Sequence, residues 1–337
     1  MRIAIIGGGI AGALLALRLR QASRRVEPVV YTGSSADASG ASGGLTRAFE
    51  SDPEACRTAA ESLAELRASA TLRDWAGFRE IGSLYLLPAG ADPAGPVAVV
   101  DEVLPGSAVV LDREGLRRAY PFRDLPAGAL GVAERHAGHI HPDRLRAAAL
   151  RDPGISVRRT PVLAVTPKAE VRLPDGSTLG HDAVVVAAGA WTARLLARSG
   201  LPADGLRTKQ IQYTVCAADI RGLGAFVDEP TGFYGRPAEP GTFLLGLPGD
   251  RWGIDPDAVT PDADLTRRTV AHARDTFGVP VEPIRTVASF DCYHDPAGLR
   301  LRPVAAGAPV FTFTGGSGGA AKTILATSRI AAAALLA

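Results

Sequence analysis

Cysteine and lysine are both scarce in this sequence. Only three cysteines occur, Cys56, Cys216 and Cys292, and they stand far apart with no Cys-x-x-Cys pair. This pattern excludes a disulfide framework and argues against a cysteine-bound zinc or a dithiol redox centre, so we expect a reducing, cytoplasmic location. Lysine is also limited to three positions in a chain that otherwise uses arginine, which makes each lysine a candidate functional group.

A strong net charge and a long apolar run are also missing. The 37 basic and 35 acidic residues leave a formal charge of +2 with no basic block, so nucleic acid is not an expected partner. No apolar run reaches the length of a membrane span, and the first one is interrupted by three glycines with no cleavage site after it. Neither a membrane partner nor a secretory signal is therefore expected. With 46% hydrophobic and 21% charged residues over 337 positions, the composition is typical of a soluble globular protein with room for two lobes.

What is present from the start is a strand followed by a glycine-rich turn. Apolar residues in the segment 2–6 predict a short buried strand, and Gly7, Gly9 and Gly12 follow it in a G-x-G-x-x-G arrangement. The first glycine permits a tight turn, the second lets a pyrophosphate approach the backbone, and the third lets the next helix pack closely. We therefore predict a dinucleotide site, with the N-terminus of that helix facing the phosphates. The acidic residue usually found about 20 positions later is absent. Thr32 stands there instead and can still hydrogen-bond a ribose hydroxyl.

The rest of the chain alternates strand-like and helix-like segments. A capping side chain, an early proline and a carboxylate at 51–54 mark a helix start, and an apolar run at 183–191 is typical of a parallel strand buried on both faces. Segment 88–135 is broken by prolines and glycines, so no element is predicted in it. Nucleotide-type strand–helix units thus sit at the beginning, middle and end, and the other segments are predicted to form a second, inserted lobe. The predicted strands are 81–87, 155–160, 162–166, 170–173, 183–191, 210–215, 242–247, 287–291 and 310–314, and the predicted helices after the first are 53–67, 144–150, 264–276 and the end of the chain.

Three other patterns do not support a different chemistry. The cluster 315–319 satisfies G-x-S-x-G, but no Asp, Glu or His follows Ser317, which excludes a hydrolase of that order. The same region mimics a phosphate-binding loop, but Ala321 replaces the glycine that should precede the lysine. Three histidines at 136–141 are accounted for by an ordinary loop that leads into a helix, so no metal is expected.

Several separated motifs, taken together, point to a family. They are Gly7, Gly9 and Gly12; Gly40-Ala41-Ser42 with Thr46-Arg47; Gly138, Pro142 and Leu145; 182–191; Tyr234-Gly235 with Pro237; 254–257; and Gly316-Ser317-Gly318 with Lys322. Over essentially its whole length the chain resembles the flavoprotein amine and amino-acid oxidases, the group of D-amino-acid oxidase, glycine oxidase and monomeric sarcosine oxidase. The resemblance implies an α/β fold of two lobes. A Rossmann-like FAD-binding domain (1–75, 136–206 and 286–337) would carry an inserted mixed-sheet substrate-binding domain (76–135 and 207–285).

The resemblance also implies how FAD is held, in an extended pose. The ADP half is expected against the first glycine turn, the adenine beside the backbone of Val162, and the pyrimidine edge of the flavin at the last glycine cluster, where a helix N-terminus and a cation stabilise negative charge. Cys292 lies near the position where sarcosine oxidases attach flavin through a thioether, and a buried free cysteine is the alternative. The full set of predicted cofactor-binding residues is Gly7, Gly9, Ile10, Ala11, Gly12, Thr32, Ala41, Ser42, Thr46, Arg47, Val162, Ala188, Gly189, Trp191, Cys292, Gly316, Ser317, Gly318, Gly319 and Lys322.

Two departures from the sarcosine oxidase pattern concern the chemistry. Glu50 occupies the position of an arginine that clamps the substrate carboxylate, and a carboxylate would repel that group. Either Glu50 faces an amine, or the acid group of the substrate binds elsewhere, on Lys322, Arg300 or Arg302. The lysine that assists oxygen reduction aligns with Leu244, which weakens the prediction of an oxidase without excluding it. The predicted catalytic and pocket residues are Lys322, Glu50, Tyr213, Tyr234 and His294.

The resemblance therefore implies an FAD-dependent oxidase of a C–N bond in an amine or amino acid. Its substrate would be a small molecule such as a secondary amine or an N-substituted amino acid, and O2 would accept the electrons to give H2O2. One alternative is an FAD-dependent dehydrogenase that passes electrons to another acceptor. A second is a flavin-binding accessory subunit without turnover. We expect a monomer or a small homo-oligomer.

Overall fold

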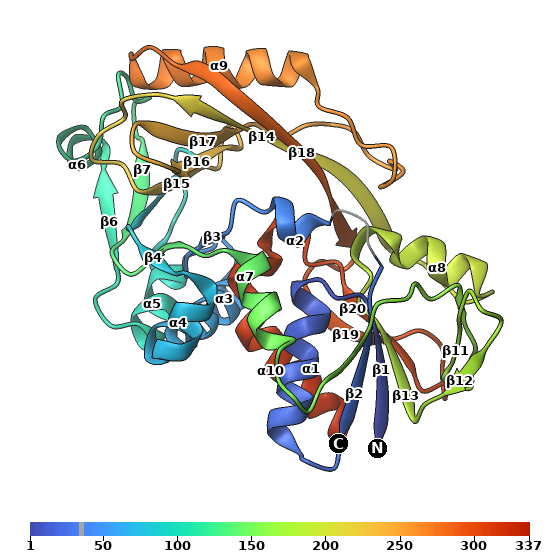
Figure 1. Cartoon of the computed structure of the whole chain (residues 1–337). Coiled ribbons are helices and arrows are strands. Elements are labelled where there is room, and N and C mark those ends of the chain that lie inside the picture. The colour runs from blue at the N-terminus through green and yellow to red at the C-terminus, as the bar shows by residue number, and fades with distance from the viewer. Residues whose placement is uncertain (34–36) are drawn as a thin grey trace.

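The chain folds into two lobes, each built around its own sheet (Figure 1). The computed structural model describes residues 1–33 and 37–337. The lower lobe of Figure 1 contains both termini and a six-stranded sheet, and the upper lobe contains an eight-stranded sheet covered by the helix α9 (Ala263–Phe277). The α/β fold with an inserted mixed-sheet lobe, predicted from the sequence, is confirmed.

The six-stranded sheet is parallel except at one edge. Its strand at that edge, β19, pairs antiparallel with β20, while all the other neighbours run parallel. Residues of the central strands are fully buried because both faces of the sheet are covered, which explains their uninterrupted apolar sequences. In spatial order the strands are β19 (Arg300–Pro303), β20 (Val310–Thr314), β13 (Ala183–Val186), β1 (Arg2–Ile6), β2 (Glu27–Tyr31) and β9 (Ser156–Arg158).

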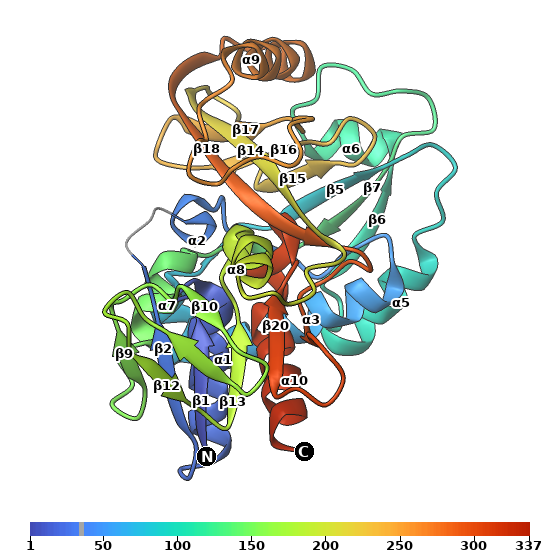
Figure 2. The same ribbon diagram turned by 90° about the vertical axis from the view of Figure 1, so that its right-hand side faces the viewer.

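Helices cover one face of this sheet and a small sheet covers the other (Figure 2). On the first face lie α1 (Ile10–Ala22), α3 (Pro53–Ala68) and α10 (Ala320–Leu336). On the second face lie α8 (Thr192–Arg198) and the three-stranded sheet β10 (Ala164–Val165), β11 (Glu170–Arg172) and β12 (Thr178–Gly180).

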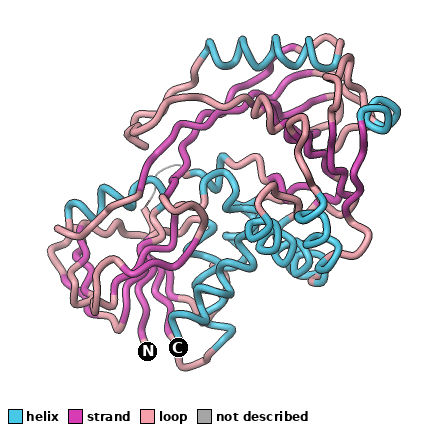
Figure 3. Tube along the Cα trace, turned by 180° about the vertical axis from the view of Figure 1, so that it is seen from behind, coloured by secondary structure: helices cyan, strands magenta, loops and turns pink. Residues whose placement is uncertain are grey.

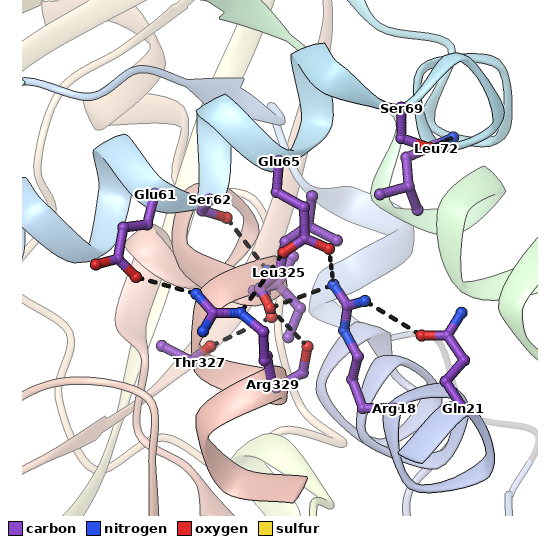
Figure 4. A network of polar contacts seen from close by, with 12 residues as sticks. Arg18, Gln21, Glu61, Ser62, Glu65, Ser69, Leu72, Leu325, Thr327 and Arg329 are labelled. Carbon is purple, nitrogen blue, oxygen red and sulfur yellow. Dashed lines mark hydrogen bonds and ion pairs between the residues drawn. The ribbon is translucent and has the colours of Figure 1, made fainter. Parts of the chain in front are cut away.

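Charged side chains lock the three helices of the first face together (Figure 4). Arg18 of α1 pairs with Glu65 of α3, and Arg329 of α10 pairs with Glu61 at 3.0 Å. The backbone N–H of Leu325 donates to the hydroxyl of Ser62 at 3.2 Å. The hydroxyl and the ion pairs thus tie α10, the last element of the chain, to elements formed near its beginning.

The eight-stranded sheet is mixed, and two of its strands are unusually long. Only β15 and β5 pair in parallel, and the other neighbours are antiparallel. The long strands β14 and β18 run from the upper lobe into the lower one (Figures 1 and 3). In spatial order the strands are β18 (Glu282–His294), β14 (Leu206–Ala217), β17 (Thr242–Gly246), β16 (Phe233–Pro237), β15 (Ala225–Asp228), β5 (Ser83–Leu87), β7 (Leu130–Glu134) and β6 (Ala108–Asp112).

The remaining elements connect the lobes. A small antiparallel sheet of β3 (Leu45–Thr46), β8 (Gly138–His139) and β4 (Arg79–Glu80) holds the segment after residue 40 in place. The remaining helices are α2 (Ala38–Ala41), α4 (Ala70–Ala76), α5 (Ala94–Val103), α6 (Arg113–Ala119) and α7 (Pro142–Ala149), with 3₁₀ turns at Gly189–Trp191 and Ser317–Gly319.

The elements predicted from the sequence are all present, with ends that differ by a few residues. The prediction for segment 88–135 is wrong, because this segment contains α5, β6, α6 and β7. Its elements are short and partly exposed, so the apolar periodicity of their sequences is weak. The division into domains stays a prediction, and its boundary at 285/286 falls inside β18.

The last helix corrects one expectation about apolar runs. Residues 317–336 are long and apolar enough, by length and composition, to cross a membrane. In this structure the helix buries Ile324, Leu325 and Ala326 against α1 and α3, which is how a core helix packs. The segment is apolar along its whole length because it is rich in alanine, although only one side of the helix is buried.

We expect the burial of α10 to be measurable as stability. Leu325→Ala removes a side chain that is 2% exposed, and the resulting cavity should lower the free energy of unfolding by about 2–5 kcal/mol. Ile330→Ala is the matched control on the same helix, because Ile330 is 55% exposed and should change stability by less than about 0.5 kcal/mol. Urea unfolding followed by circular dichroism at a constant FAD concentration tests both; equal effects of the two substitutions would contradict this packing.

Candidate functional site

Two adjoining cavities lie where the lobes meet. The first, of about 390 Å³, is lined by the first glycine turn, the start of α1, the loop around Val162 and the end of β20. The second, of about 330 Å³, lies between α2, β14, β16 and the start of α10. They adjoin because six residues line both: Ile10, Ala38, Ser39, Asp291, Ser317 and Ala320.

The glycine turn has the geometry that a dinucleotide requires. Gly7 has φ +119°, which disfavours a side chain, and a Cβ on it would lie 2.3 Å from the carbonyl oxygen of Ala187. A Cβ on Gly12 would lie 2.0 Å from the carbonyl oxygen of Gly7, so only glycine lets α1 approach the turn this closely. Gly9 is the N-cap of α1 and lines the cavity, which brings the N-terminus of α1 to the first cavity.

Most of the predicted cofactor-binding residues gather around these cavities. Thr32 lines the first one, and its hydroxyl donates to the carbonyl of Gly33 at 3.2 Å. Trp191 lines it too, packs edge-on against Phe290 and donates from its indole N–H to Asp257 at 2.9 Å. The predicted residues around the first cavity are Gly7, Gly9, Ile10, Ala11, Thr32, Val162, Ala188, Gly189, Trp191, Cys292, Gly316 and Ser317, and those around the second are Ala41, Ser42, Arg47, Gly318, Lys322, Tyr213 and Tyr234, with Ile10 and Ser317 shared.

Among the described residues, five predicted ones line neither of these cavities. Gly12 packs behind the glycine turn, Thr46 is buried in β3, and Gly319 lies beside Lys322. Glu50 lies behind Lys322, as described below. His294 lies at the end of β18, contacts the carbonyl of Pro296 at 3.1 Å and lines neither cavity as described, so its role stays a prediction.

Glu50 neutralises the lysine of the site. Its carboxylate pairs with the ammonium of Lys322 and with the guanidinium of Arg47 at 3.2 Å. Burial opposes ionisation, but the charges of Arg47 and Lys322 outweigh it and hold the pKa of Glu50 below its usual value. Burial in turn lowers the pKa of Lys322, although Glu50 acts against this. The lysine therefore already has an internal partner, which weakens its attraction for a substrate carboxylate.

A second glutamate, which the sequence analysis missed, holds this loop in position. Glu134 at the end of β7 accepts the backbone N–H groups of Ala48 at 2.9 Å and Phe49 at 3.1 Å. Burial raises its pKa, despite these hydrogen bonds and the nearby charge of Arg47. Arg47 also stacks over the ring of Tyr85, 4.5 Å from its centroid. The sequence does not reveal that Glu134 holds this loop, because the backbone groups that it binds lie more than 80 positions away.

The two arginines that were alternatives for a carboxylate site lie elsewhere. Arg300 pairs with Glu54 at 3.0 Å on the surface, and Arg302 donates to the backbone carbonyl of Gly298 at 2.9 Å. Neither lines the second cavity as the structure describes it. The structure therefore gives no support to either as a ligand of the substrate.

Two charged residues that the sequence analysis did not select line the second cavity. Lys209 of β14 stands directly opposite Asp291 of β18 in the antiparallel ladder, so both side chains lie on the same face. Asp291 is 6% exposed, and burial raises the pKa of its carboxyl to about 7 although Lys209 lowers it. The sequence could have pointed to Asp291, because it is a single aspartate inside an otherwise uncharged strand segment.

Cys292 lies beside Asp291 but on the other face of β18. Successive residues of a strand alternate between faces, and Cys292 lines the first cavity while Asp291 lines both. Burial raises the pKa of its thiol, which disfavours the thiolate. A covalent link between Cys292 and flavin stays a prediction.

Comparison with known proteins identifies the family of the chain. Residues 2–334 match the family described as DAO, FAD dependent oxidoreductase. The chain belongs to this family. FAD is therefore the cofactor of the enzyme, and the glycine turn, the helix N-terminus and the two adjoining cavities fit it.

Relatives of this FAD-dependent oxidoreductase include both a sequence and solved structures. The tRNA 5-methylaminomethyl-2-thiouridine biosynthesis bifunctional protein MnmC of Chromohalobacter salexigens is 29% identical over an alignment of 323 residues that covers 90% of this chain. The matched part is only 42% of the length of that relative.

The solved structures share its fold at low identity. L-proline dehydrogenase from P. horikoshii superposes with a TM-score of 0.82 at 16% identity, covering 98% of this chain and 92% of the other. Glycine oxidase from Geobacillus kaustophilus gives 0.79 at 21% identity, with 99% and 94% covered. A Tyr258Phe mutant of NikD, described as an unusual amino acid oxidase essential for nikkomycin biosynthesis, gives 0.78 at 22% identity, with 98% and 92% covered.

The close packing at Gly12 predicts that adding a single methyl group at this position weakens FAD binding. Gly12→Ala would place a carbon against the carbonyl oxygen of Gly7, so the turn must shift and FAD affinity should fall at least about tenfold, about 1.4 kcal/mol. Gly180→Ala is the control, since a Cβ there meets nothing within 4 Å. The ratio of flavin to protein absorbance, followed by FAD titration of the stripped protein, measures the effect; unchanged affinity in Gly12→Ala would contradict this packing.

The ion pair of Glu50 predicts how the site treats anions. Glu50→Gln leaves Lys322 and Arg47 without their counter-charge, so a small carboxylate such as benzoate should bind about tenfold more tightly than to the wild type. Glu54→Gln is the matched control, because Glu54 pairs with Arg300 on the surface. Binding is measured as the change in flavin absorbance. No gain in affinity would show that Glu50 does not neutralise the site.

Proposed function

We propose that this FAD-dependent oxidoreductase oxidises a C–N bond in a small amine or amino acid. The observation that carries the proposal is the second cavity, which adjoins the FAD cavity and whose lining brings together Tyr213, Tyr234, Lys209 and Asp291. A few converging polar groups in a small cleft are typical of a site for a small polar molecule. Bound FAD supplies the acceptor for the hydride removed from the carbon next to nitrogen.

The names of similar proteins support this substrate class. Glycine oxidase, L-proline dehydrogenase and an amino acid oxidase share the fold. The name of the MnmC relative contains a methylaminomethyl group, which is itself a secondary amine. Together these favour a secondary amine or an N-substituted amino acid for this chain.

The residues of the chain orient the substrate and keep water out. The hydroxyl of Tyr234 donates to the carbonyl of Gln212 at 3.2 Å, so its ring forms a fixed wall between β16 and β14. Burial raises the pKa of Tyr234 and of Tyr213, which therefore remain protonated at neutral pH. Because Glu50 forms an ion pair with Lys322, this lysine is not a simple binding site for a substrate carboxylate. The site therefore favours a substrate whose charges are arranged differently.

Oxygen is proposed as the electron acceptor, and one observation favours a dehydrogenase instead. Leu244, at the position where a lysine would assist oxygen reduction, is 2% exposed and packs near Gly43 of the second cavity. No positive charge is available from that side chain. The same reaction with a different acceptor is therefore the second candidate.

An anaerobic screen tests the proposal. The FAD-loaded protein is mixed with primary and secondary amines and with D-, L- and N-methyl amino acids, and loss of flavin absorbance is recorded. We expect at least one amine to reduce the flavin, while matched hydroxy acids do not. If no amine reduces the flavin, the proposed function is wrong. Repeating turnover in air then separates the acceptors, because an oxidase forms peroxide in step with substrate loss and a dehydrogenase requires an added dye.

A further inference from the structure

Asp291 is the buried acidic group that the established chemistry of the site leaves unused. It lines both cavities, and it is the acidic residue that they share. We propose that the carboxylate of Asp291 binds the ammonium group of the substrate and accepts its proton, so that the amine is neutral when its C–H bond is oxidised. This inference rests on the proposed oxidation of an amine.

The position of the carboxylate points to a ligand. Oδ2 of Asp291 is buried and has no hydrogen-bond partner in the part of the chain that the structure describes. A Cβ added to Gly318 would lie 3.2 Å from this oxygen, so the carboxylate sits at the glycine turn that begins the last helix. A buried polar atom without a partner is costly, and a donor from a bound molecule removes that cost.

Asp291 can exchange a proton near neutral pH, whereas the tyrosines and the cysteine around it have pKa values raised further from neutral. Burial raises the pKa of Asp291 to about 7, and the charge of Lys209 on β14 lowers it. Burial, with a contribution from Asp291, raises the pKa of Tyr293 on β18 to about 12 and raises that of Tyr234 on β16 as well. Burial also raises the pKa of the Cys292 thiol on the other face of β18.

The helices packed against this point add no competing base. On α10, Lys322 is engaged by Glu50, which stands behind it. On α2, residues 38–41 carry no titratable side chain, and the N-cap residue Asp37 pairs with Arg146. Asp291 therefore faces one cation, Lys209, and tyrosines that keep their protons.

The proton step balances without another reactant. The substrate ammonium gives one proton to the carboxylate, so that a neutral amine with a free lone pair and a neutral carboxyl group result. Above about pH 7 the carboxylate is ionised, and below about pH 10 an aliphatic amine is protonated, so the two charges attract each other across this range. The lone pair is what allows the neighbouring C–H bond to lose a hydride.

The position of Lys209 extends the argument to amino acids. It stands opposite Asp291 on the same face of the ladder, and no carboxylate pairs with it among the described residues. Its ammonium lies 4.7 Å from the ring centroid of Trp252. A zwitterion placed over this face of the two strands would meet a cation at its acid end and an anion at its amine end, which replaces the carboxylate site that Glu50 closes.

The test uses the FAD-loaded full chain with Asp291→Asn, Asp291→Glu and a matched control. Asp228→Asn is the control, because Asp228 belongs to the same sheet and lines neither cavity as described. The rate constant for flavin reduction, divided by the apparent dissociation constant, is measured from about pH 5 to about pH 10 with the amine that reduces the wild type fastest. A second measurement is free of turnover: glycine betaine, which has a fixed positive charge and no proton to release, is titrated by flavin absorbance over the same range.

We expect the wild-type rate to rise as Asp291 ionises near pH 7. Asp291→Asn should lower the rate above that pH by about 100-fold, converge with the wild type at low pH, and recover only as the amine itself deprotonates. Asp291→Glu should restore the rise near neutral pH in part, and Asp228→Asn should leave the profile unchanged. Betaine affinity should rise about tenfold with pH in the wild type and stay flat in Asp291→Asn.

The outcomes separate this inference from the proposed function. If amines reduce the wild type but Asp291→Asn keeps the same pH profile and the same betaine affinity, Asp291 is not the amine-binding group. If Asp291→Asn instead changes FAD retention and leaves both pH dependences intact, the carboxylate contacts the cofactor and the inference is likewise overturned. If no amine reduces the wild type, the proposed function fails, and the betaine titration still decides whether Asp291 binds a cation.

Discussion

The antiparallel ladder between β14 and β18 is the constraint on which the site depends. It starts in the upper lobe and continues into the lower one, where β18 lines both cavities and β14 lines the second. Phe290 and Cys292 face the cofactor cavity on one side, and Lys209, Asp291 and Tyr213 face the substrate cavity on the other. Because strand residues alternate between faces, a single register places cofactor-facing and substrate-facing side chains next to each other in the chain. A shift by one residue would exchange the two sets.

Electrostatics then decides what this site can accept. The cations nearest the start of α10, Lys322 and Arg47, share the single carboxylate of Glu50, and the loop that carries Arg47 is held by the buried Glu134. The free charges lie instead on the ladder, as Lys209 and Asp291. One carboxylate thus engages the cations beside α10, while Lys209 and Asp291 on the ladder have no ion-pair partner among the described residues. This difference follows from pairings between residues far apart in the chain.

The prediction from the sequence succeeded where the pattern that identifies an element lies within a single segment of the chain. The first glycine turn, the buried strand at 183–186 and the terminal helix each have a local pattern with a direct physical meaning, and each is found where it was expected. It failed in segment 88–135, where short and partly exposed elements depend on pairing with β5. His294, predicted as a pocket residue, lies at the end of β18 and lines neither of the two cavities as described. The prediction did not identify Glu50 as the partner of Lys322, because the two residues lie far apart in the chain.

The sequence by itself determined that this chain binds a dinucleotide, because a close approach of backbone to phosphate requires glycine at defined spacings. That three glycine-bearing segments share this task stays a prediction. The sequence also determined, through the absence of a basic block and of cysteine pairs, which classes of function to set aside. Only the tertiary structure decided which charges remain free in the site. Ion pairing depends on distances between side chains such as Glu50 and Lys322, which lie far apart in the chain and meet only in the folded protein. Lys209 and Asp291 likewise come to lie opposite each other only when β14 and β18 pair.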